Sequence, residues 1–210
     1  MIPAQPKPYS EACERNQAPI LALLRQWLRD GDRVLEIGSG TGQHAVYFGA
    51  ALPDVVWQTA DVVAHHAGIR AWLDEARLPN VLPPLALDVN AFDWPEAAFD
   101  AVFSANTAHI MSWPEVRRMV AGAARALRRG GVFVLYGPFR AGGVHTAESN
   151  ARFDAALRAG DPFMGIRDRE ALAAEAAAAG LTLEEDVAMP ANNRTLCWRK
   201  TSGNGRILDS

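Results

Sequence analysis

The stretch Val34-Leu35-Glu36-Ile37-Gly38-Ser39-Gly40-Thr41-Gly42 joins a short apolar run to a turn with three glycines at alternate positions. The apolar run predicts a buried strand, Arg33–Ile37, and an apolar stripe after the turn predicts a helix. Such a turn lets the main chain approach a ligand closely at the helix N-terminus. The residue three after Gly40 is Gln43, so the GxGxxG pattern of a pyrophosphate site is missing. The turn therefore favours a nucleoside ligand without a diphosphate.

Strand-length apolar runs and helical stripes alternate through the rest of the chain, which predicts a mostly parallel α/β sheet with helices on both faces. Further strands are expected at 55–60, 81–87, 101–105 and 132–136, with 181–189 and 194–199 as a closing antiparallel hairpin. Pro83-Pro84 removes two hydrogen-bond donors from the third strand, so this strand must lie at a sheet edge. Gly130-Gly131 is expected to end a helix, and the polar segment 137–168 to carry one short helix near 150–158.

Length and composition indicate a single globular domain. The chain has 210 residues, 49% of them hydrophobic and 21% charged, and its net charge is −3. The weak negative charge argues against a nucleic-acid partner. We expect a domain over 1–199 with an N-terminal lid segment, 1–17, and a flexible tail, 200–210.

Two cysteines far apart, Cys13 and Cys197, exclude a disulfide framework and a thiolate metal site. No apolar run approaches 18 residues and the first residues have no signal-peptide pattern, so a cytoplasmic protein without a membrane partner is expected. The sequence leaves a homodimer open.

Acidic residues follow the first three predicted strands. Glu36 ends the first strand, Asp61 the second and Asp88 the third. The carboxyl ends of neighbouring parallel strands meet at one edge of the sheet, where ligands of open α/β sheets bind. Asp61 is placed to accept hydrogen bonds from both ribose hydroxyls of a nucleoside. Asp88, with Val89 beside it, is placed to accept a hydrogen bond from the exocyclic amine of adenine. The alternatives are a helix cap at Asp61, a simple turn at Asp88, and a glycine connection without a ligand.

This combination resembles class I S-adenosylmethionine-dependent methyltransferases, in which acids and a glycine turn follow the first strands and a hairpin closes a seven-stranded sheet. Longer motifs resemble the methyltransferase-like 26 family, catalogued as a domain of unknown function. These motifs are Tyr9-Ser-Glu-Ala-Cys-Glu-Arg-Asn-Gln-Ala-Pro-Ile-Leu21, Gly40-Thr-Gly-Gln-His44, Leu78-Pro-Asn-Val-Leu-Pro-Pro-Leu-Ala-Leu-Asp88, Tyr136-Gly-Pro-Phe139, His145-Thr-Ala-Glu-Ser-Asn150, Gly165-Ile-Arg-Asp168 and Met189-Pro-Ala-Asn-Asn193. Met164 departs from the resemblance, because a tryptophan is expected at that position.

The resemblance implies a Rossmann-like sheet in the strand order 3-2-1-4-5-7-6, S-adenosylmethionine as the cofactor and S-adenosylhomocysteine as the product. The cofactor-binding residues that it implies lie in the turn and at the strand ends. They are Glu36, Gly38, Ser39, Gly40, Gly42, Asp61, Asp88, Val89 and Asn106.

His109, three residues after Asn106, is a candidate general base, because an imidazole there can take a proton from an acceptor hydroxyl or amine. Tyr136, at the end of the fifth strand, is a candidate for lining the acceptor site. The alternatives are a histidine hydrogen-bonded within a helix start and a core aromatic. Candidate substrate-binding residues are Tyr9, Arg15, Asn16, Asn150, Met164 and Asn193, although Arg15 and Asn16 also suit an ordinary N-terminal lid with solvated charges.

The predicted function is methyl transfer from S-adenosylmethionine to an oxygen or nitrogen of a small molecule, without a metal. Two alternatives remain open. One is a module that binds the cofactor without turning it over and acts through a protein partner. The other is an NAD(P)-dependent oxidoreductase, because a glycine turn followed by an acid also serves NAD.

Overall fold

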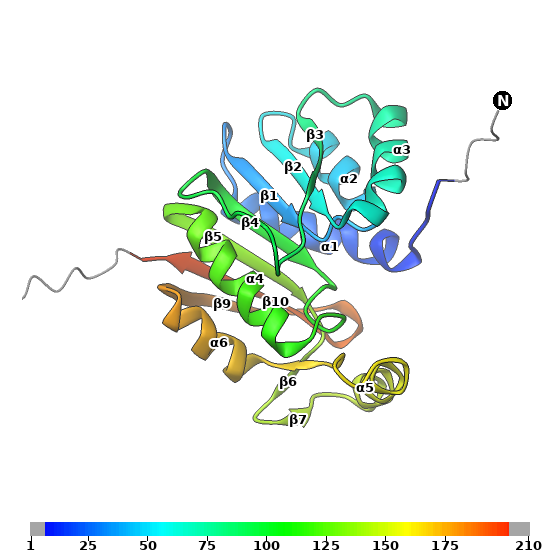
Figure 1. The fold of residues 1–210 in the computed structure, drawn as a ribbon, viewed down its shortest axis with the longest axis vertical. Coiled ribbons are helices and arrows are strands. Elements are labelled where there is room, and N and C mark those ends of the chain that lie inside the picture. Colours follow the sequence, from blue (N-terminus) through cyan, green and yellow to red (C-terminus); the bar gives the residue numbers. More distant parts are fainter. Residues whose placement is uncertain (1–6, 202–210) are drawn as a thin grey trace, which may run out of the picture.

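The seven strands of the main sheet lie in the order β3-β2-β1-β4-β5-β10-β9 in a computed structural model that describes residues 7–201 (Figure 1). These strands are β1 (Arg33–Ile37), β2 (Val56–Asp61), β3 (Val81–Ala86), β4 (Phe99–Ala105), β5 (Leu127–Gly137), β9 (Leu181–Met189) and β10 (Asn193–Lys200). The first five are parallel, and β10 is antiparallel to both β5 and β9. The order confirms the prediction, with the hairpin strands numbered β9 and β10.

Helices cover both faces of the sheet. On one face lie α1 (Glu11–Trp27), α2 (Gln43–Ala51) and α3 (His66–Ala76), and on the other α4 (Trp113–Ala126) and α6 (Arg169–Ala178) (Figure 1). Helix α5 (Glu148–Gly160) belongs to the segment between β5 and α6, and single 3₁₀ turns occur at η1 (Val63–His65) and η2 (Pro190–Asn192). No helix within residues 7–201 is both long and apolar enough to span a bilayer.

Strand β1 lies at the centre of the sheet, and both of its faces carry buried apolar side chains. Val34 packs with α1 and α2, whereas Leu35 and Ile37 pack with α4. All three side chains are buried, as expected for a parallel strand with helices on both sides. The central position carries the glycine turn after Ile37 to the middle of the carboxyl edge of the sheet.

The proline pair lies in an edge strand, as predicted. Pro83 and Pro84 fall where the pairing of β3 with β2 changes register, opposite Thr59. The Gln58 side chain donates to the Pro83 carbonyl oxygen at 2.7 Å, and the Thr59 hydroxyl donates to the Leu82 carbonyl oxygen at 2.7 Å. Side chains of β2 therefore replace part of the main-chain pairing that proline interrupts.

Several sequence-based expectations were wrong. Helix α4 ends at Ala126, before the glycines at 130 and 131, because Leu127 already pairs with Phe99 in the sheet. Segment 137–168 contains strands as well as a helix: β6 (Phe139–Ala141) pairs with β7 (Val144–His145) and β8 (Arg167–Asp168).

The predicted chain ends need correction where the structure describes them. Residues 11–17 of the expected lid are the first turns of α1, which packs on α2. Lys200 of the expected tail is the last residue of β10. Residues 1–6 of the lid and 202–210 of the tail lie outside the described residues.

Candidate functional site

The glycine turn is closed on one side and open on the other. Gly38 has φ +73°, and a Cβ atom there would lie 2.3 Å from the Thr107 methyl carbon. Gly40 has φ +58°, and no atom lies within 4 Å of the place where its Cβ atom would be. The turn thus packs against the loop that follows β4, while the main chain at Gly40 faces free space.

Ser39 holds the turn to the two strands beneath it. Its hydroxyl donates to the Glu36 carboxylate at 2.9 Å and accepts from the main-chain N–H of Ala60 at 3.1 Å. The indole N–H of Trp57 also donates to Glu36, at 3.1 Å. Glu36 is therefore a fixed part of the base of the turn.

Burial raises the pKa of Glu36 to about 7, against the opposing effect of the hydrogen bonds from Trp57 and Ser39, while the charge of Asp61 raises it further. Only 2% of the residue is exposed. The carboxyl group therefore keeps its proton to a higher pH than an ordinary glutamate does.

Asp61 joins the second strand to the turn. Its carboxylate accepts from the main-chain N–H of Gly40 at 2.7 Å and from that of Val62 at 2.7 Å. The His65 Nδ1 atom lies 2.8 Å from the same carboxylate, and the His65 side chain is 54% exposed. Because His65 is at the surface, it can move aside when a hydroxyl ligand approaches Asp61.

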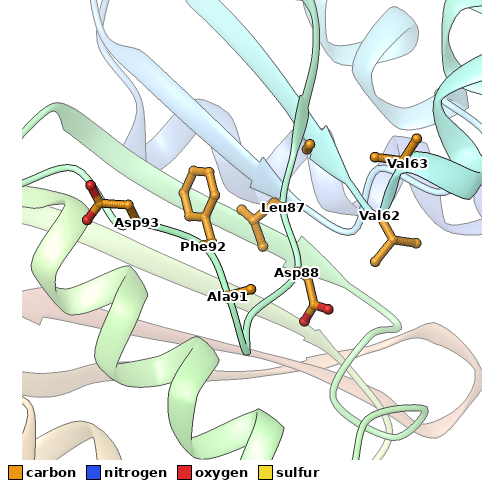
Figure 2. A pocket seen from close by; sticks show the side chains of 8 residues that line it. Val62, Val63, Leu87, Asp88, Ala91, Phe92 and Asp93 are labelled. Atoms are coloured by element: carbon orange, nitrogen blue, oxygen red, sulfur yellow. The ribbon is translucent and has the colours of Figure 1, made fainter.

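A cleft of about 530 Å³ opens beside Asp61, at the carboxyl ends of β2 and β3. Figure 2 shows Val62 and Val63 on one side of it and Leu87, Asp88 and Phe92 on the other. The Asp88 side chain is exposed, and among residues 7–201 it accepts a hydrogen bond only from the nearby main-chain N–H of Asn90, whereas Val89 is buried. The cleft has apolar walls and two carboxylates, Asp88 and Asp93, and apolar walls with a few polar groups suit a purine ring. The sequence analysis did not identify Val62 or Val63.

The helix after the turn binds the N-terminal segment. Gly42 begins α2 and faces α3, because its Cβ atom would lie 3.1 Å from the Ile69 Cα atom. The Gln43 side chain accepts from the main-chain N–H of Ser10 at 2.5 Å and donates to the Ser10 carbonyl oxygen at 3.3 Å. The Trp72 indole donates to the Pro8 carbonyl oxygen at 2.7 Å. The segment 7–10 is thereby fixed to α2 and α3 next to the turn.

Replacement of Gln43 by alanine is expected to release this segment. The substitution removes both hydrogen bonds to Ser10, while the contacts of α1 with α2 remain. Hydrogen exchange of the Ser10 amide should become at least tenfold faster, with the exchange of the β1 amides unchanged. Unchanged exchange at Ser10 would contradict the assignment.

A polar cluster occupies the end of β5, where α1, α2 and the β9–β10 hairpin meet. The His44 Nε2 atom lies 2.6 Å from the Asn16 Oδ1 atom, and both side chains are buried. Burial raises the pKa of Tyr136, although hydrogen bonds with Asn16 and Asn193 lower it in part. The Tyr136 carbonyl oxygen accepts from the main-chain N–H of Asn106, which has φ +59°. The structure thus brings Asn16, Tyr136 and Asn193 together and ties them to Asn106.

His109 lies in the loop between β4 and α4 and is only 7% exposed. Burial, with the positive charge of Arg167 as a smaller cause, lowers the pKa of His109 to about 4. Its ring packs edge-on against Phe153, with ring centroids 5.2 Å apart, and its nitrogens make no hydrogen bond to another residue of 7–201. The imidazole is therefore neutral at physiological pH, with a free acceptor nitrogen.

Other predicted residues lie away from these groups or have local partners. Tyr9 is exposed, and Arg15 pairs with Glu11 on the surface of α1. The Asn150 amide donates to the Asn192 carbonyl oxygen at 3.0 Å, which ties α5 to the hairpin turn. Met164 is half-buried in the segment between α5 and β8. The sequence analysis missed Gln43, His44 and Arg167 as organising residues, because their partners are distant in the sequence.

A family model described as "Protein of unknown function (DUF938)" matches residues 7–200. The chain belongs to the DUF938 family. The match includes the glycine turn, all three acids and the segment that carries His109, so the residues described above lie within the family's domain.

Solved structures with the same fold include several methyltransferases. An O-methyltransferase family protein from Burkholderia thailandensis superposes with a TM-score of 0.77 at 18% identity, over 92% of this chain and 58% of that protein. The YcgJ protein from Bacillus subtilis superposes with a TM-score of 0.72 at 16% identity, over 90% of this chain and 100% of YcgJ. PigF, solved with SAH, gives 0.76 at 16% identity, over 89% of this chain and 56% of that one. The chain thus spans little more than half of the first and third. The likeness shows the Rossmann-like fold of class I methyltransferases.

The residues at the carboxyl edge fit an adenosyl group. Three features follow one another along this edge: the open side of Gly40, the Asp61 carboxylate, and the cleft at Val62 and Asp88. Within residues 7–201, no three His, Cys, Asp or Glu side chains are grouped so as to hold a metal ion.

Proposed function

We propose that this protein transfers a methyl group from S-adenosylmethionine to an oxygen or nitrogen of a small molecule. The observation that supports this most is the continuous edge from the open glycine turn, past Asp61, to the cleft at Asp88. The acidic side chains along this edge suit a cationic ligand better than a dinucleotide diphosphate. The resemblance of the longer motifs to the methyltransferase-like 26 family also supports the cofactor, without naming an acceptor.

We assign the adenosyl site to the residues of this edge. Asp61 would accept the ribose hydroxyls, with His65 moving aside, and Asp88 would accept from the adenine amine. The adenine ring would lie between Val62 and Leu87, with Val89 buried in the core beside Asp88. Gly38, Ser39, Gly40 and Gly42 shape the turn, with Glu36 beneath it and Asn106 at the neighbouring strand end.

Bound S-adenosylmethionine supplies a methyl group on a positive sulfur, which leaves as a neutral thioether. The chain then has to orient an acceptor and exclude water, and both effects lower the barrier. A hydroxyl proton becomes strongly acidic as the oxygen gains the methyl group, so even a weak base can accept it. His109, neutral and without a hydrogen-bond partner among residues 7–201, is the proposed base. Tyr136 and Asn193 would line the acceptor, which is expected to be held near Asn16.

Thermal unfolding with S-adenosylhomocysteine and with NAD tests the proposed cofactor. A ligand that binds only the folded state adds about 2.7 kcal/mol at 100 times its Kd, which for a chain of this size raises Tm by roughly 5–10 °C. We expect this shift with S-adenosylhomocysteine and none with NAD. The reverse result would support an oxidoreductase and refute the proposal.

Two acidic residues of the cleft provide a matched pair of variants. Asp88→Ala is expected to weaken S-adenosylhomocysteine binding about tenfold, because a charged acceptor of one hydrogen bond contributes about 1.4 kcal/mol or more. Asp93→Ala removes an exposed carboxylate from the far end of the same cleft and should leave the affinity within twofold. Calorimetric titration measures both. Equal effects would refute the assignment of Asp88 to the adenine amine.

Transfer of labelled methyl groups to a fractionated metabolite extract tests turnover itself. Binding of S-adenosylhomocysteine without transfer to any fraction would favour a module that holds the cofactor and acts through a protein partner.

A further inference from the structure

Arg167, in the short strand β8, is a buried arginine without a carboxylate partner among the described residues. Its guanidinium instead donates to three main-chain carbonyl oxygens: Ala108 at 2.9 Å, Phe163 at 2.8 Å, and Met111. Burying a guanidinium is costly unless its N–H groups are hydrogen-bonded. Here the N–H groups are hydrogen-bonded to carbonyl groups of two different loops.

Two of these carbonyl groups flank His109 in the sequence. The loop between β4 and α4 is bonded to Arg167 through Ala108 on one side of His109 and through Met111 on the other. The main-chain N–H of Gly165 donates to the carbonyl oxygen of His109 itself, at 2.9 Å. The main chain of the loop is therefore fixed at three of its residues by the segment that leads into β8.

The segment that holds Arg167 is itself anchored. The Asp154 carboxylate accepts from the main-chain N–H of Ile166 at 2.6 Å and from Arg158 at 3.0 Å. Gly165 has φ +148°, and a Cβ atom there would lie 2.8 Å from the Asp154 carboxylate and 2.5 Å from the Arg158 guanidinium. Arg167 thus reaches the His109 loop from a rigid base on α5.

We infer that Arg167 is a positioning residue for His109: it fixes the loop that carries the imidazole and brings a positive charge into that loop, on both sides of His109 in the sequence. The inference rests on the proposed function only in giving His109 a role as base. The planar guanidinium of an arginine has several N–H groups and can bind the carbonyl oxygens of Ala108 and Met111 at the same time. The ammonium group of a lysine, on a flexible side chain, does this less well. The positive charge disfavours a second proton on the ring and so keeps the acceptor nitrogen free.

Charges of both signs surround this pair. Arg140 and Arg158 act on Arg167 as like charges, and Asp154 and Glu115 oppose them to a smaller extent. Among residues 7–201, Arg167 is the charged group that acts on His109. Removal of the Arg167 charge should therefore be felt directly at the imidazole.

The test is the NMR titration of the five histidines in the intact chain, with the His109 signal assigned by its absence in His109→Gln. In Arg167→Met, both the charge and the bonds to the loop are lost, and we expect the pKa of His109 to rise from about 4 toward the ordinary value of 6.5, without reaching it because the ring stays buried. In Arg167→Lys, the charge remains, and the rise should be less than half as large.

His44 is an internal control, because burial also lowers its pKa, to about 4, and it lies on α2. A general loosening of the Met variant would move His44 together with His109, and that result would overturn the inference. An unchanged His109 pKa in folded Arg167→Met would also overturn it.

Arg128→Met serves as a second control, because it removes an arginine that pairs with Asp100 elsewhere on the surface. It should leave the titration of His109 unchanged. Affinity for S-adenosylhomocysteine, measured separately, should stay within twofold of the parent in the Arg167 variants. Failure of every variant and of the parent to bind it would refute the proposed cofactor while leaving the titration result intact.

Discussion

Replacement of Gly38 by alanine is expected to lower the free energy of unfolding by about 2–5 kcal/mol. A left-handed backbone costs a residue with a Cβ atom about 1–2 kcal/mol, and overpacking a filled site costs about 1–3 kcal/mol more. Both costs apply, because Gly38 has φ +73° and its Cβ atom would lie 2.3 Å from the Thr107 methyl carbon. Urea unfolding of the variant and the parent measures the difference.

The Thr107→Ser background separates these two costs. Serine keeps the hydroxyl that lies 2.6 Å from Ser104 but removes the methyl group that the new Cβ atom would meet. In this background, Gly38→Ala should cost only the backbone part, about 1–2 kcal/mol. An equal cost in both backgrounds would show that Thr107 does not close this side of the turn.

Replacement of Glu36 by glutamine is expected to change how stability depends on pH. The pKa of Glu36 is raised from 4.5 to about 7, mainly by burial. At low pH, the carboxyl group is protonated in both states. As pH rises above 4.5, the unfolded chain ionises first, so the folded state loses stability until Glu36 itself ionises near pH 7. The pKa shift corresponds to a loss of about 3 kcal/mol in the free energy of unfolding.

Glutamine has no proton to lose and can still accept from Ser39 and Trp57. The difference in unfolding free energy between Glu36→Gln and the parent should therefore grow by about 3 kcal/mol in favour of the variant between pH 4 and pH 8. Glu96→Gln, which changes an exposed glutamate in a loop, should follow the parent throughout. A constant difference for Glu36→Gln would mean that the carboxyl group ionises as easily in the folded protein as in the unfolded one.

The sequence predicted the parts of the molecule that depend on short-range patterns. The turn at Gly38 and the acids at 61 and 88 follow apolar runs directly, so their place at the carboxyl edge followed from the parallel sheet. The hairpin and the edge strand with two prolines were equally local signals.

The parts that the sequence did not predict depend on contacts between distant residues. Gln43 binds Ser10, and Arg167 binds the loop at 108–111; neither pairing has a periodic pattern in the sequence. The three strands β6, β7 and β8 contain two or three residues each, too few for a recognisable alternation. The end of α4 was predicted too late in the sequence, at the glycines 130 and 131. The helix ends earlier because Leu127 already pairs with Phe99 in the sheet.

The register change at Pro83 and Pro84 also affects how copies of this chain can meet. An exposed outer strand normally presents a row of free N–H groups on which another molecule can add its own strand, the first step toward fibres. Two prolines in succession interrupt that row on β3, and at the opposite border β9 carries the exposed charged side chains Glu184 and Glu185, of which Glu184 pairs with Arg199. Both borders thus disfavour edge-to-edge growth of the sheet, so we expect any homodimer of this chain to form through its helices or loops.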